Sequence, residues 1–247
     1  MQNTTSIILS RMITASRQID VIANNIANVS TPGYQALHVQ SASWTDQMRR
    51  VSAPPGGGSL TFTYSPGTWR STRAGALKVT GNPLDLAVTG DGYFTVQTGQ
   101  GVRLTRDGSF TLLANGSIGT ISGNPLLDTS GSPIQVPPHG GPLTVAADGT
   151  VSDQTGILGQ IGVVKVADPS NLVAAGGGLL QSNAPTQAVT QPAIVQGAIE
   201  GSNVQPVVEI TRMMRASQNF QMLAQFISAE QSRSQTAISQ LLGPTNS

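Results

Sequence analysis

The chain contains no cysteine among its 247 residues. Disulfide bonds, thiol catalysis and cysteine-ligated metal sites are therefore excluded. Histidine is almost as scarce, because only His38 and His139 are present, and no motif joins either of them to a serine and an acidic residue or to other metal ligands. The sequence accordingly predicts no catalytic residue, no bound metal and no cofactor.

Three aspartates are the remaining candidates for acid–base chemistry, and each has a structural explanation. Asp91 and Asp107 each precede a glycine, and Asp-Gly pairs form tight turns because both residues tolerate a positive φ. Asp85 lies at an expected strand end, where its carboxylate can accept backbone N–H groups. We therefore expect all three to have structural roles.

Charge is scarce and unevenly distributed along the chain. Charged residues make up 10% of the sequence, compared with about 25% in an ordinary soluble domain. Residues 1–80 have a net charge of +5, and residues 81–199 have a net charge of −4. The basic residues are too sparse to neutralise several phosphates, so the sequence predicts no nucleic-acid partner.

Long apolar runs are also missing. No stretch approaches the roughly 18 consecutive apolar residues that a transmembrane helix needs, so we expect no membrane insertion. The N-terminus lacks a basic segment followed by an apolar one, which argues against a general secretory signal peptide. If the protein leaves the cytoplasm, we expect a dedicated export route and no cleaved signal peptide.

A repeating apolar pattern is present near the N-terminus. Residues 5–29 are expected to form one amphipathic helix that ends at Thr31-Pro32-Gly33, because Pro32 disfavours a helical conformation at Thr31. The apolar residues alternate in spacings of four and three, which is the heptad pattern by which helices pack against each other. This N-terminal seam comprises Ile8, Met12, Ala15, Ile19, Ile22, Ile26 and Val29.

A second helix with the same alternation is expected near the C-terminus. Ser202 or Asn203 is its expected N-cap, Pro206 falls in its first turn, and Gly243-Pro244 ends it. Because each helix needs a partner from the far end of the chain or from another subunit, the two seams predict assembly. The C-terminal seam comprises Ile210, Met213, Ser217, Phe220, Ala224, Ile227, Gln231, Ser234, Ile238 and Leu241, and its three polar members weaken it.

The middle of the chain is expected to be β-rich. Turn dipeptides at Asp91-Gly92, Asp107-Gly108, Asn115-Gly116 and Asp148-Gly149 separate short alternating segments. This spacing predicts a mainly antiparallel domain, with a meander through positions 91–116 rather than βαβ units. The expected strands are 84–88, 93–97, 102–105, 109–113, 117–121, 143–146 and 161–166.

These patterns predict an α+β fold with a discontinuous helical domain. Residues 1–33 and 202–243 are expected to pair as a coiled-coil-like inner domain. Residues 34–75 are expected to form a connecting arm, with a loop in the Pro- and Gly-rich stretch at 53–58. Residues 76–201 are expected to form the β-rich outer domain.

Three stretches of the sequence carry a family resemblance. Residues 23–34 read ANNIANVSTPGY, residues 82–96 read NPLDLAVTGDGYFTV with TRDGSF at 105–110, and residues 197–204 read GAIEGSNV. In this order they resemble the signature segments of the bacterial flagellar rod and hook proteins, and the resemblance covers nearly the whole chain. The sequence departs from the family's usual residues at one place, because Gln35-Ala36 follows Tyr34.

The resemblance implies a structural component of the flagellar basal-body rod, most similar to the proximal-rod members of the family. It implies that the terminal helices line the axis, that the assembly transmits torque, and that the subunit is exported by the flagellar export apparatus. Implied partners are other proximal-rod subunits, the distal-rod protein and further copies of this chain. Two alternatives are a distal-rod protein of the same family and a β-rich peptidoglycan-processing enzyme.

The cluster Asn24, Asn25 and Asn28 at the end of the first helix allows two interpretations. Asparagine amides can bond backbone groups across a subunit contact, or they can end the helix. We include all three in the expected assembly interface. The interface further comprises the apolar members of both seams together with Ser202, Asn203 and Val204.

Overall fold

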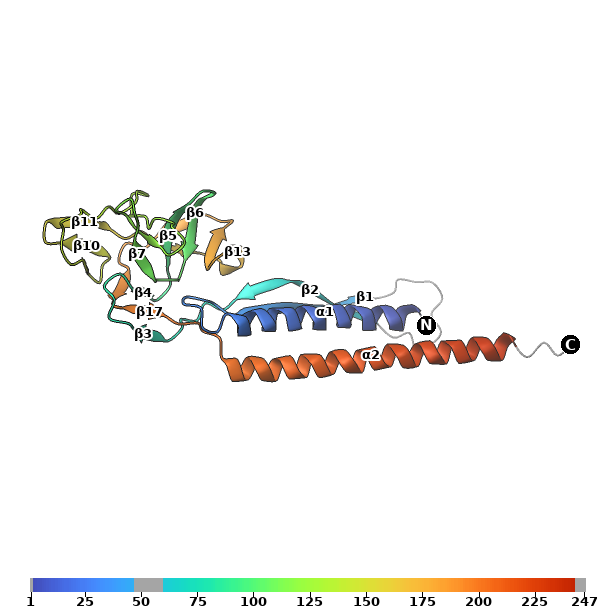
Figure 1. Cartoon of the computed structure of the whole chain (residues 1–247). Helices are drawn as coiled ribbons and strands as arrows, with labels where there is room; N and C mark the ends of the chain where they lie inside the picture. Colours follow the sequence, from blue (N-terminus) through green and yellow to red (C-terminus); the bar gives the residue numbers. More distant parts are fainter. Residues whose placement is uncertain (1, 47–59, 243–247) are drawn as a thin grey trace. The chain divides into compact units, whose positions relative to one another are not determined.

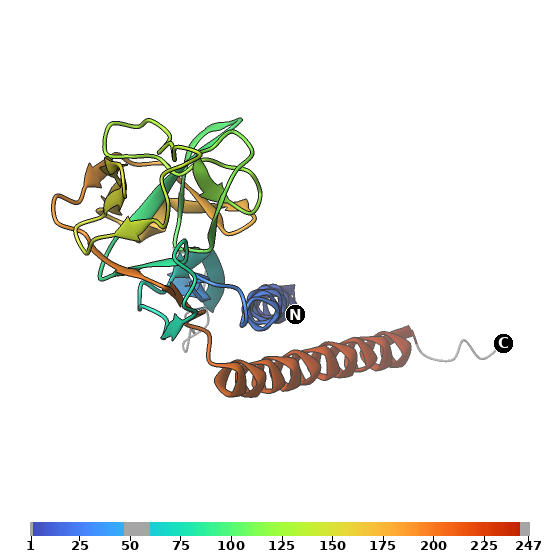
Figure 2. The same cartoon turned by 60° about the vertical axis from the view of Figure 1, so that its left-hand side comes forward.

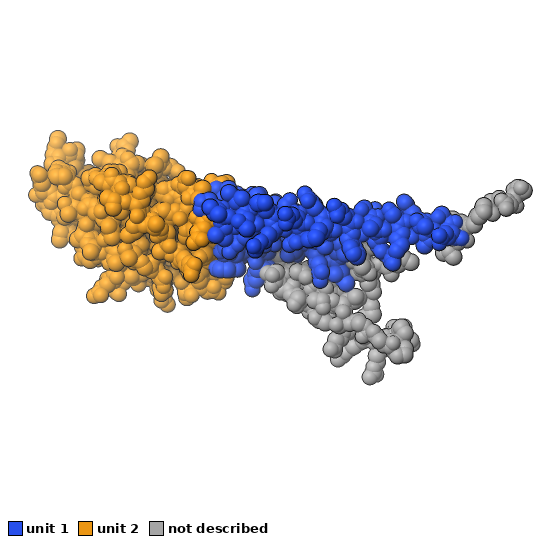
Figure 3. All heavy atoms as spheres, turned by 90° about the horizontal axis from the view of Figure 1, so that it is seen from below, with its two compact units in different colours: residues 1–26, 37–69, 206–247 blue, residues 27–36, 70–205 orange. Residues whose placement is uncertain are grey.

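The computed structural model describes residues 2–46 and 60–242. The chain divides into two compact units, shown in blue and orange in Figure 3. Unit 1 contains residues 1–26, 37–69 and 206–247, and unit 2 contains residues 27–36 and 70–205. The expected loop at 53–58 and the helix end at Gly243-Pro244 lie outside the described residues.

Unit 1 consists of two long helices and a two-stranded sheet (Figure 1). Helix α1 spans Gln2–Ala27, the strands are β1 (Leu37–Asp46) and β2 (Leu60–Arg70), and helix α2 spans Pro206–Leu242. Ile8, Ala15 and Ile22 of the N-terminal seam are the buried apolar side chains of α1. The expected first helix is therefore confirmed, but it ends at Ala27, so Val29 of the expected seam lies after it. The buried seam members, which are seven residues apart, mark the face that packs inward.

The start of α2 differs from the expected one. Because the helix begins at Pro206, Ser202 and Asn203 lie before its first turn and do not cap it. The side chains of these two residues bond other groups: Ser202 accepts the N–H of Val204, and Asn203 accepts the N–H of Ala36. Pro206 at the first helical position agrees with the expectation, since a proline there sacrifices no intrahelical hydrogen bond.

The inward face of α2 is rotated by one residue from the expected seam at two positions. Glu209 and Ala216 are each 3% exposed, whereas the neighbouring Ile210 is 49% exposed. Figures 1 and 2 show that α1 and α2 run in opposite directions and cross at an angle. An open groove lies between parts of the two helices. This groove does not confirm the continuous coiled-coil pairing that the seams predict.

Unit 2 is built on a six-stranded antiparallel sheet, in the order β13-β14-β6-β5-β12-β15. The remaining strands form the pairs β16-β4, β17-β3 and β7-β8 and the three-stranded sheet β11-β10-β9. The strands are β3 Leu77–Val79, β4 Leu86–Thr89, β5 Tyr93–Thr98, β6 Gly101–Thr105, β7 Phe110–Leu112, β8 Ile118–Thr120, β9 Thr144–Val145, β10 Thr150–Asp153, β11 Gly156–Gln160, β12 Val163–Val166, β13 Leu172–Gly176, β14 Leu179–Ser182, β15 Thr186–Ala188, β16 Ala193–Gln196 and β17 Ala198–Glu200, with a 3₁₀ turn at Pro169–Asn171.

Both faces of the central sheet are covered. Along β5, Phe94 and Val96 belong to the larger hydrophobic core, where Phe94 meets Phe110 edge-to-face at 5.2 Å between ring centroids. Tyr93 points to the opposite face and joins a smaller core with Leu104 and Val166. Because the strand is covered on both faces, its residues 93–96 are all buried, and the hydroxyl of the one aliphatic polar residue, Thr95, donates to the carbonyl oxygen of Gly162.

The expected antiparallel pairing of the domain is confirmed, but the expected meander through positions 91–116 is wrong, because β6 and β7 do not pair with each other. Asn115-Gly116 joins β7 to β8 and Asp148-Gly149 joins β9 to β10, as hairpin signals predict. Asp107-Gly108, in contrast, joins no hairpin, since β6 pairs with the distant β14. Gly108 instead lies against the backbone of Leu86, where a Cβ atom would fall 1.5 Å from the carbonyl oxygen of that residue.

Candidate functional site: a junction of three motifs

The three sequence motifs meet in unit 2 at a buried ion pair. Arg106 Nη1 and Glu200 Oε2 are 2.8 Å apart, and both side chains are 3% exposed. Arg106 follows β6, and Glu200 ends β17, so 94 residues of sequence separate the partners. We call the surrounding contacts of residues 33–36, 70–75, 106 and 200–203 the motif junction.

The hydrogen bonds of this ion pair reach several backbone segments. Arg106 also donates to the carbonyl oxygens of Val88 and Gly90. Glu200 Oε1 accepts the backbone N–H of Gly75 at 2.8 Å. Buried charges are tolerated only when they are paired and hydrogen-bonded, and here the bonds also hold four chain segments together.

Gly33 brings the first motif onto this ion pair. Its N–H donates to the carbonyl oxygen of Glu200 at 2.8 Å. Its φ is +66°, and a Cβ atom would fall 2.3 Å from the carbonyl carbon of Arg106. Only glycine combines this left-handed conformation with such a close backbone approach.

Asn203 connects the third motif to the same junction. Its Oδ1 accepts the N–H of Ala36 at 2.7 Å, and its Nδ2 donates to the carbonyl oxygens of Ser71 and Arg73. The backbone N–H of Asn203 donates to the carbonyl oxygen of Tyr34. The amide of Asn203 therefore bonds the chain both at Ala36, just before β1, and at residues 71–73, just after β2.

A second polar cluster lies in unit 1, at the C-terminal end of α1. Asn25 is fully buried, accepts the N–H of Leu37 at 2.9 Å and donates to the carbonyl oxygen of the same residue at 2.8 Å. It also donates to Glu209 Oε2 at 3.2 Å. Glu209 forms an ion pair with Arg212 at 2.6 Å. This cluster joins α1, β1 and α2. The side chain of Asn25 therefore forms its hydrogen bonds within its own chain.

His38 lies beside this cluster and stacks on Trp69, with 4.6 Å between ring centroids. Burial lowers the pKa of His38, the positive charge of Arg212 lowers it further, and Glu209 opposes the shift. His139 is exposed in its loop. Among the described residues, no group of three or more histidine, aspartate or glutamate side chains could hold a metal ion.

The apolar surface of unit 1 lies mostly on the two helices. The groove between them, of about 630 Å³, is lined by Ile8 and Ala15 of α1 and by Met222, Leu223 and Phe226 of α2. The large apolar side chains of the two helices that are half exposed or more are Leu9, Ile13, Val207, Met214, Met222, Phe226 and Ile238. Within the described range, neither helix is long and apolar enough to cross a bilayer.

The structure places the expected interface residues in different environments. Val204 is buried, Asn24 and Ile238 are exposed, and the side chain of Leu241 lies outside the described residues. The partly buried members are Met12, Ile19, Ile26, Asn28, Val29, Ser202, Asn203, Met213, Phe220, Ala224 and Ile227. Their role in assembly stays a prediction.

Sequence reasoning missed Arg106 and Glu200 as functional residues. Both lie inside the quoted motifs, within TRDGSF and GAIEGSNV. TRDGSF is polar, with Asp107 beside Arg106, so it is typical of an exposed turn and does not indicate burial. GAIEGSNV contains one charged residue, Glu200, among small and apolar residues, which is a weak signal for a buried carboxylate. The sequence alone therefore does not pair the two motifs.

Comparison with known proteins gives the motif junction a family context. Residues 7–35 match the family described as flagella basal body rod protein, residues 87–153 match the flagellar hook protein FlgE/F/G D1 domain, and residues 195–241 match the flagellar basal body rod FlgEFG protein C-terminal region. The three matched regions include Gly33, Arg106, Glu200 and Asn203 of the motif junction, and its segment 70–75 lies between the first two.

Full-length relatives agree with these matches. The chain is 36% identical to the flagellar basal-body rod protein FlgF of Caulobacter vibrioides and 34% identical to FlgF of Mesorhizobium japonicum, with 98% of each chain covered in both cases. It is 32% identical to the flagellar basal-body rod protein FlgG of Bacillus subtilis, over 86% of this chain and 89% of that protein.

The chain therefore belongs to the FlgE/F/G family of flagellar basal-body rod and hook proteins. Within this family its similarity to FlgF extends over nearly the full length of both chains, and FlgG is not better supported. The chain is a structural component of the flagellar basal body rather than an enzyme. The alternative of a peptidoglycan-processing enzyme is thereby wrong, since these relatives are rod proteins.

Proposed function

We propose that this chain forms part of the proximal rod and polymerises through its terminal helices, which pair in coiled-coil fashion and line the rod axis. The observation that carries this proposal is the exposed apolar surface of α1 and α2. Phe226 is 58% exposed, Met222 is 60% exposed and Ile13 is 62% exposed. Apolar residues gathered on a helix surface favour contact with another protein surface.

The motif junction supports a mechanical role within this proposal. Torque passes between subunits only if each subunit resists deformation where its segments meet. The Arg106–Glu200 ion pair and the bonds of Gly33 and Asn203 give unit 2 such a resistance, because hydrogen-bonded networks in a low-dielectric interior are rigid. Unit 2 would then add lateral contacts around the axis.

The proposed partners are other proximal-rod subunits, the distal-rod protein FlgG and further copies of this chain. Head-to-tail contacts that do not close into a ring generate a helical filament, which is the geometry a rod requires. We further propose export through the flagellar export apparatus without a cleaved signal peptide, and a final location in the part of the rod that crosses the periplasm. The family membership supports these proposals.

The alternative assignment to the distal rod is tested by identifying the subunits that lie next to this chain in the assembled rod. Cross-linking of assembled basal bodies through cysteines introduced on α2 would identify the adjacent subunits. A proximal-rod protein gives cross-links to both proximal-rod subunits and FlgG. Cross-links to FlgG-like copies and to the hook alone would identify a distal-rod protein.

Substitution of the groove tests polymerisation itself. Phe226→Asp places a charge in the apolar groove, and Gln225→Asp places the same charge one position earlier, on an exposed residue that does not line the groove. We expect both variants to fold, and we expect only Gln225→Asp to restore rods in a strain lacking the protein. Normal rods with Phe226→Asp would contradict assembly through this surface.

A further inference from the structure

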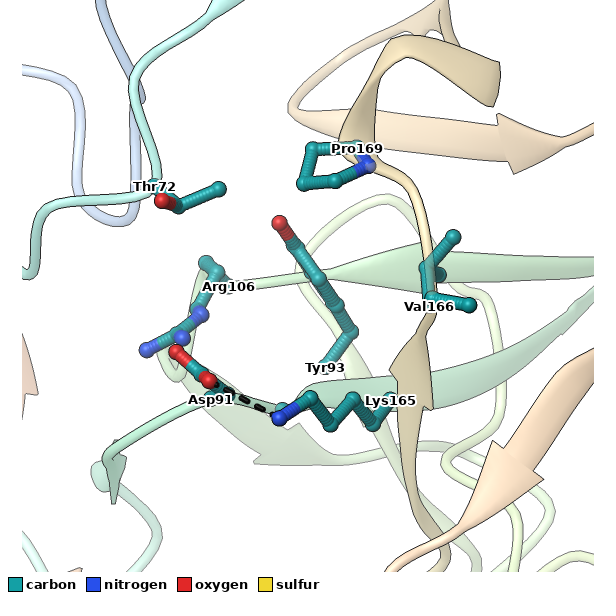
Figure 4. A pocket seen from close by; sticks show the side chains of 9 residues that line it. Thr72, Asp91, Tyr93, Arg106, Lys165, Val166 and Pro169 are labelled. Carbon is teal, nitrogen blue, oxygen red and sulfur yellow. Dashed lines mark hydrogen bonds and ion pairs between the residues drawn. The ribbon is translucent and has the colours of Figure 1, made fainter.

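A second feature of unit 2 is a small pocket beside the motif junction, with a volume of about 220 Å³. Figure 4 shows Tyr93 and Arg106 between two groups of lining residues, with Thr72 and Pro169 on one side and the Asp91–Lys165 pair on the other. Lys165 Nζ and Asp91 Oδ2 are 3.0 Å apart, and the two side chains are 51% and 66% exposed. This exposed ion pair forms the rim of the pocket.

Buried hydrogen-bond donors without acceptors gather around Tyr93. Arg106 Nε, Arg70 Nε and Gln35 Nε2 are buried and have no acceptor among the described residues. The three side chains are connected: Tyr93 donates its hydroxyl to Gln35 Oε1 at 3.1 Å, Arg70 donates to the carbonyl oxygen of Gln35, and the Arg106 guanidinium lies 5.3 Å from the Tyr93 ring centroid. Nearly all buried polar groups in proteins have a partner, so each of these donors calls for an acceptor. Of the three residues, Arg106 lines the pocket.

The charge balance of this cluster points the same way. Two guanidinium groups, those of Arg70 and Arg106, are buried here, and the buried carboxylate of Glu200 forms its ion pair with Arg106. Burial lowers the pKa of Arg70, whose carbonyl acceptor on Gln35 carries no charge. An uncompensated buried cation is unfavourable. Arg70 does not line the pocket, so an anion there would offset its charge from a distance and would make its direct contacts with Arg106 and Lys165, which do line it.

We propose that the pocket binds an oxyanion group, which accepts hydrogen bonds from Arg106 Nε and from Lys165 at the rim. Arginine and lysine are the side chains that proteins use for carboxylate and phosphate recognition. The oxyanion competes with Asp91 for Lys165, so the rim pair opens as the group enters. The group comes either from a free small anion or from an acidic side chain of a neighbouring subunit, and only the second source rests on the proposed function.

Titration of the monomeric full-length protein with inorganic phosphate tests the site, at an ionic strength held constant with chloride. The readout is the side-chain Nε–H resonance of Arg106 in ¹⁵N-labelled protein, together with the apparent dissociation constant. Lys165→Gln removes the rim cation, and we expect it to weaken binding about two- to fivefold, as is typical of an exposed charge contact. Asp91→Asn removes the competing carboxylate, and we expect tighter binding by a similar factor.

Both substitutions are at exposed positions, and asparagine shares the turn preference of aspartate, so the fold is preserved. Lys78→Gln is the matched control, since Lys78 is an exposed lysine of β3 that does not line the pocket. Opposite changes for Lys165→Gln and Asp91→Asn, with none for Lys78→Gln, support the proposal.

A second arm records the same Arg106 resonance in assembled filaments without phosphate. A shift there identifies a carboxylate from a neighbouring subunit, even if free phosphate leaves the monomer unchanged. A shift in the monomer alone identifies a site for free anions. If the resonance moves in neither sample, the proposal is overturned, and failure of the filaments to form bears on the proposed function instead.

Discussion

Gly33 and Glu200 are joined by a backbone hydrogen bond of 2.8 Å across 167 positions of sequence, and the Glu200 side chain in turn binds Arg106. The bond brings the end of the first motif onto the start of the third, and both belong to unit 2. A short connection of this kind fixes where the chain enters and leaves the β domain.

Removing one partner of the buried ion pair should destabilise unit 2 strongly. Glu200→Ala leaves Arg106 buried without its carboxylate and leaves the N–H of Gly75 without its acceptor, so we expect a loss of about 3–5 kcal/mol in the free energy of unfolding. Urea unfolding followed by circular dichroism measures the change.

The exposed ion pair of the same unit provides the control. Asp91→Ala breaks the contact with Lys165, which is exposed, and should cost no more than about 1 kcal/mol. Equal losses for Glu200→Ala and Asp91→Ala would show that the burial of Arg106 and Glu200 has no energetic consequence.

A side chain at position 33 should be poorly tolerated. In Gly33→Ala the left-handed φ costs about 1–2 kcal/mol, and the clash with the backbone of Arg106 adds to this cost. Gly131→Ala separates the two effects, because Gly131 has φ +83° and an open space where its Cβ would lie. Thermal unfolding should show a clearly larger loss for Gly33→Ala, and a loss equal to that of Gly131→Ala would refute the close approach.

The Asn25 side chain should protect the start of β1. Asn25→Ala leaves both the N–H and the carbonyl oxygen of Leu37 without their side-chain partner, at a cost of about 2–4 kcal/mol for the two groups. Amide hydrogen exchange should accelerate at Leu37 in Asn25→Ala and remain unchanged at this position in Asn24→Ala. Unchanged exchange in both variants would contradict the described bonds.

His38 should make the stability of unit 1 depend on pH. Because its pKa is lowered in the folded protein, the unfolded chain binds the proton more tightly, and stability falls as the pH drops from about 6.5 towards the lowered value. The folded protein therefore keeps its full stability above that window.

His38→Gln should remove this component of the pH dependence, and His139→Gln should leave it in place. Unfolding free energies measured between pH 5 and 7 compare the three proteins. Asp128 and Asp153 do not interfere. Burial alone would raise the pKa of Asp128, but hydrogen bonds from residues 130–132 outweigh it, and a hydrogen bond from the Thr155 hydroxyl lowers the pKa of Asp153. Both pKa values lie below the usual range of aspartate, so these contributions change only in more acidic solutions. Identical pH profiles for wild type and His38→Gln would contradict the burial of His38 beside Arg212.

The sequence was informative where structure is local. The heptad alternation located α1, and Asn-Gly at 115–116 located the β7–β8 hairpin, because both signals depend on neighbouring residues. The pairing of β6 with β14 joins Leu104 to Leu180, and no local pattern encodes so distant a partner. The rotation of α2 towards Glu209 depends on its bond to Asn25, which sequence spacing alone does not show.

The same distinction between local and distant contacts applies to the candidate site. The motifs that contain Arg106, Glu200 and Gly33 were visible in the sequence, although no role was predicted for Arg106 or Glu200. Their convergence was not, because it requires the backbone bond from Gly33 to Glu200 and the folded path of β17 beside β3. Short β pairs such as β3–β17 carry little periodicity, and their exposed residues Leu77, Lys78 and Val79 do not alternate.

Electron cryo-microscopy of basal bodies from a strain that lacks this protein tests the central claim most directly. If the chain is a required structural component of the rod, the rods end before the distal segment and no hook forms, and the wild-type gene restores both. Complete rods carrying hooks in the deletion strain would contradict the account.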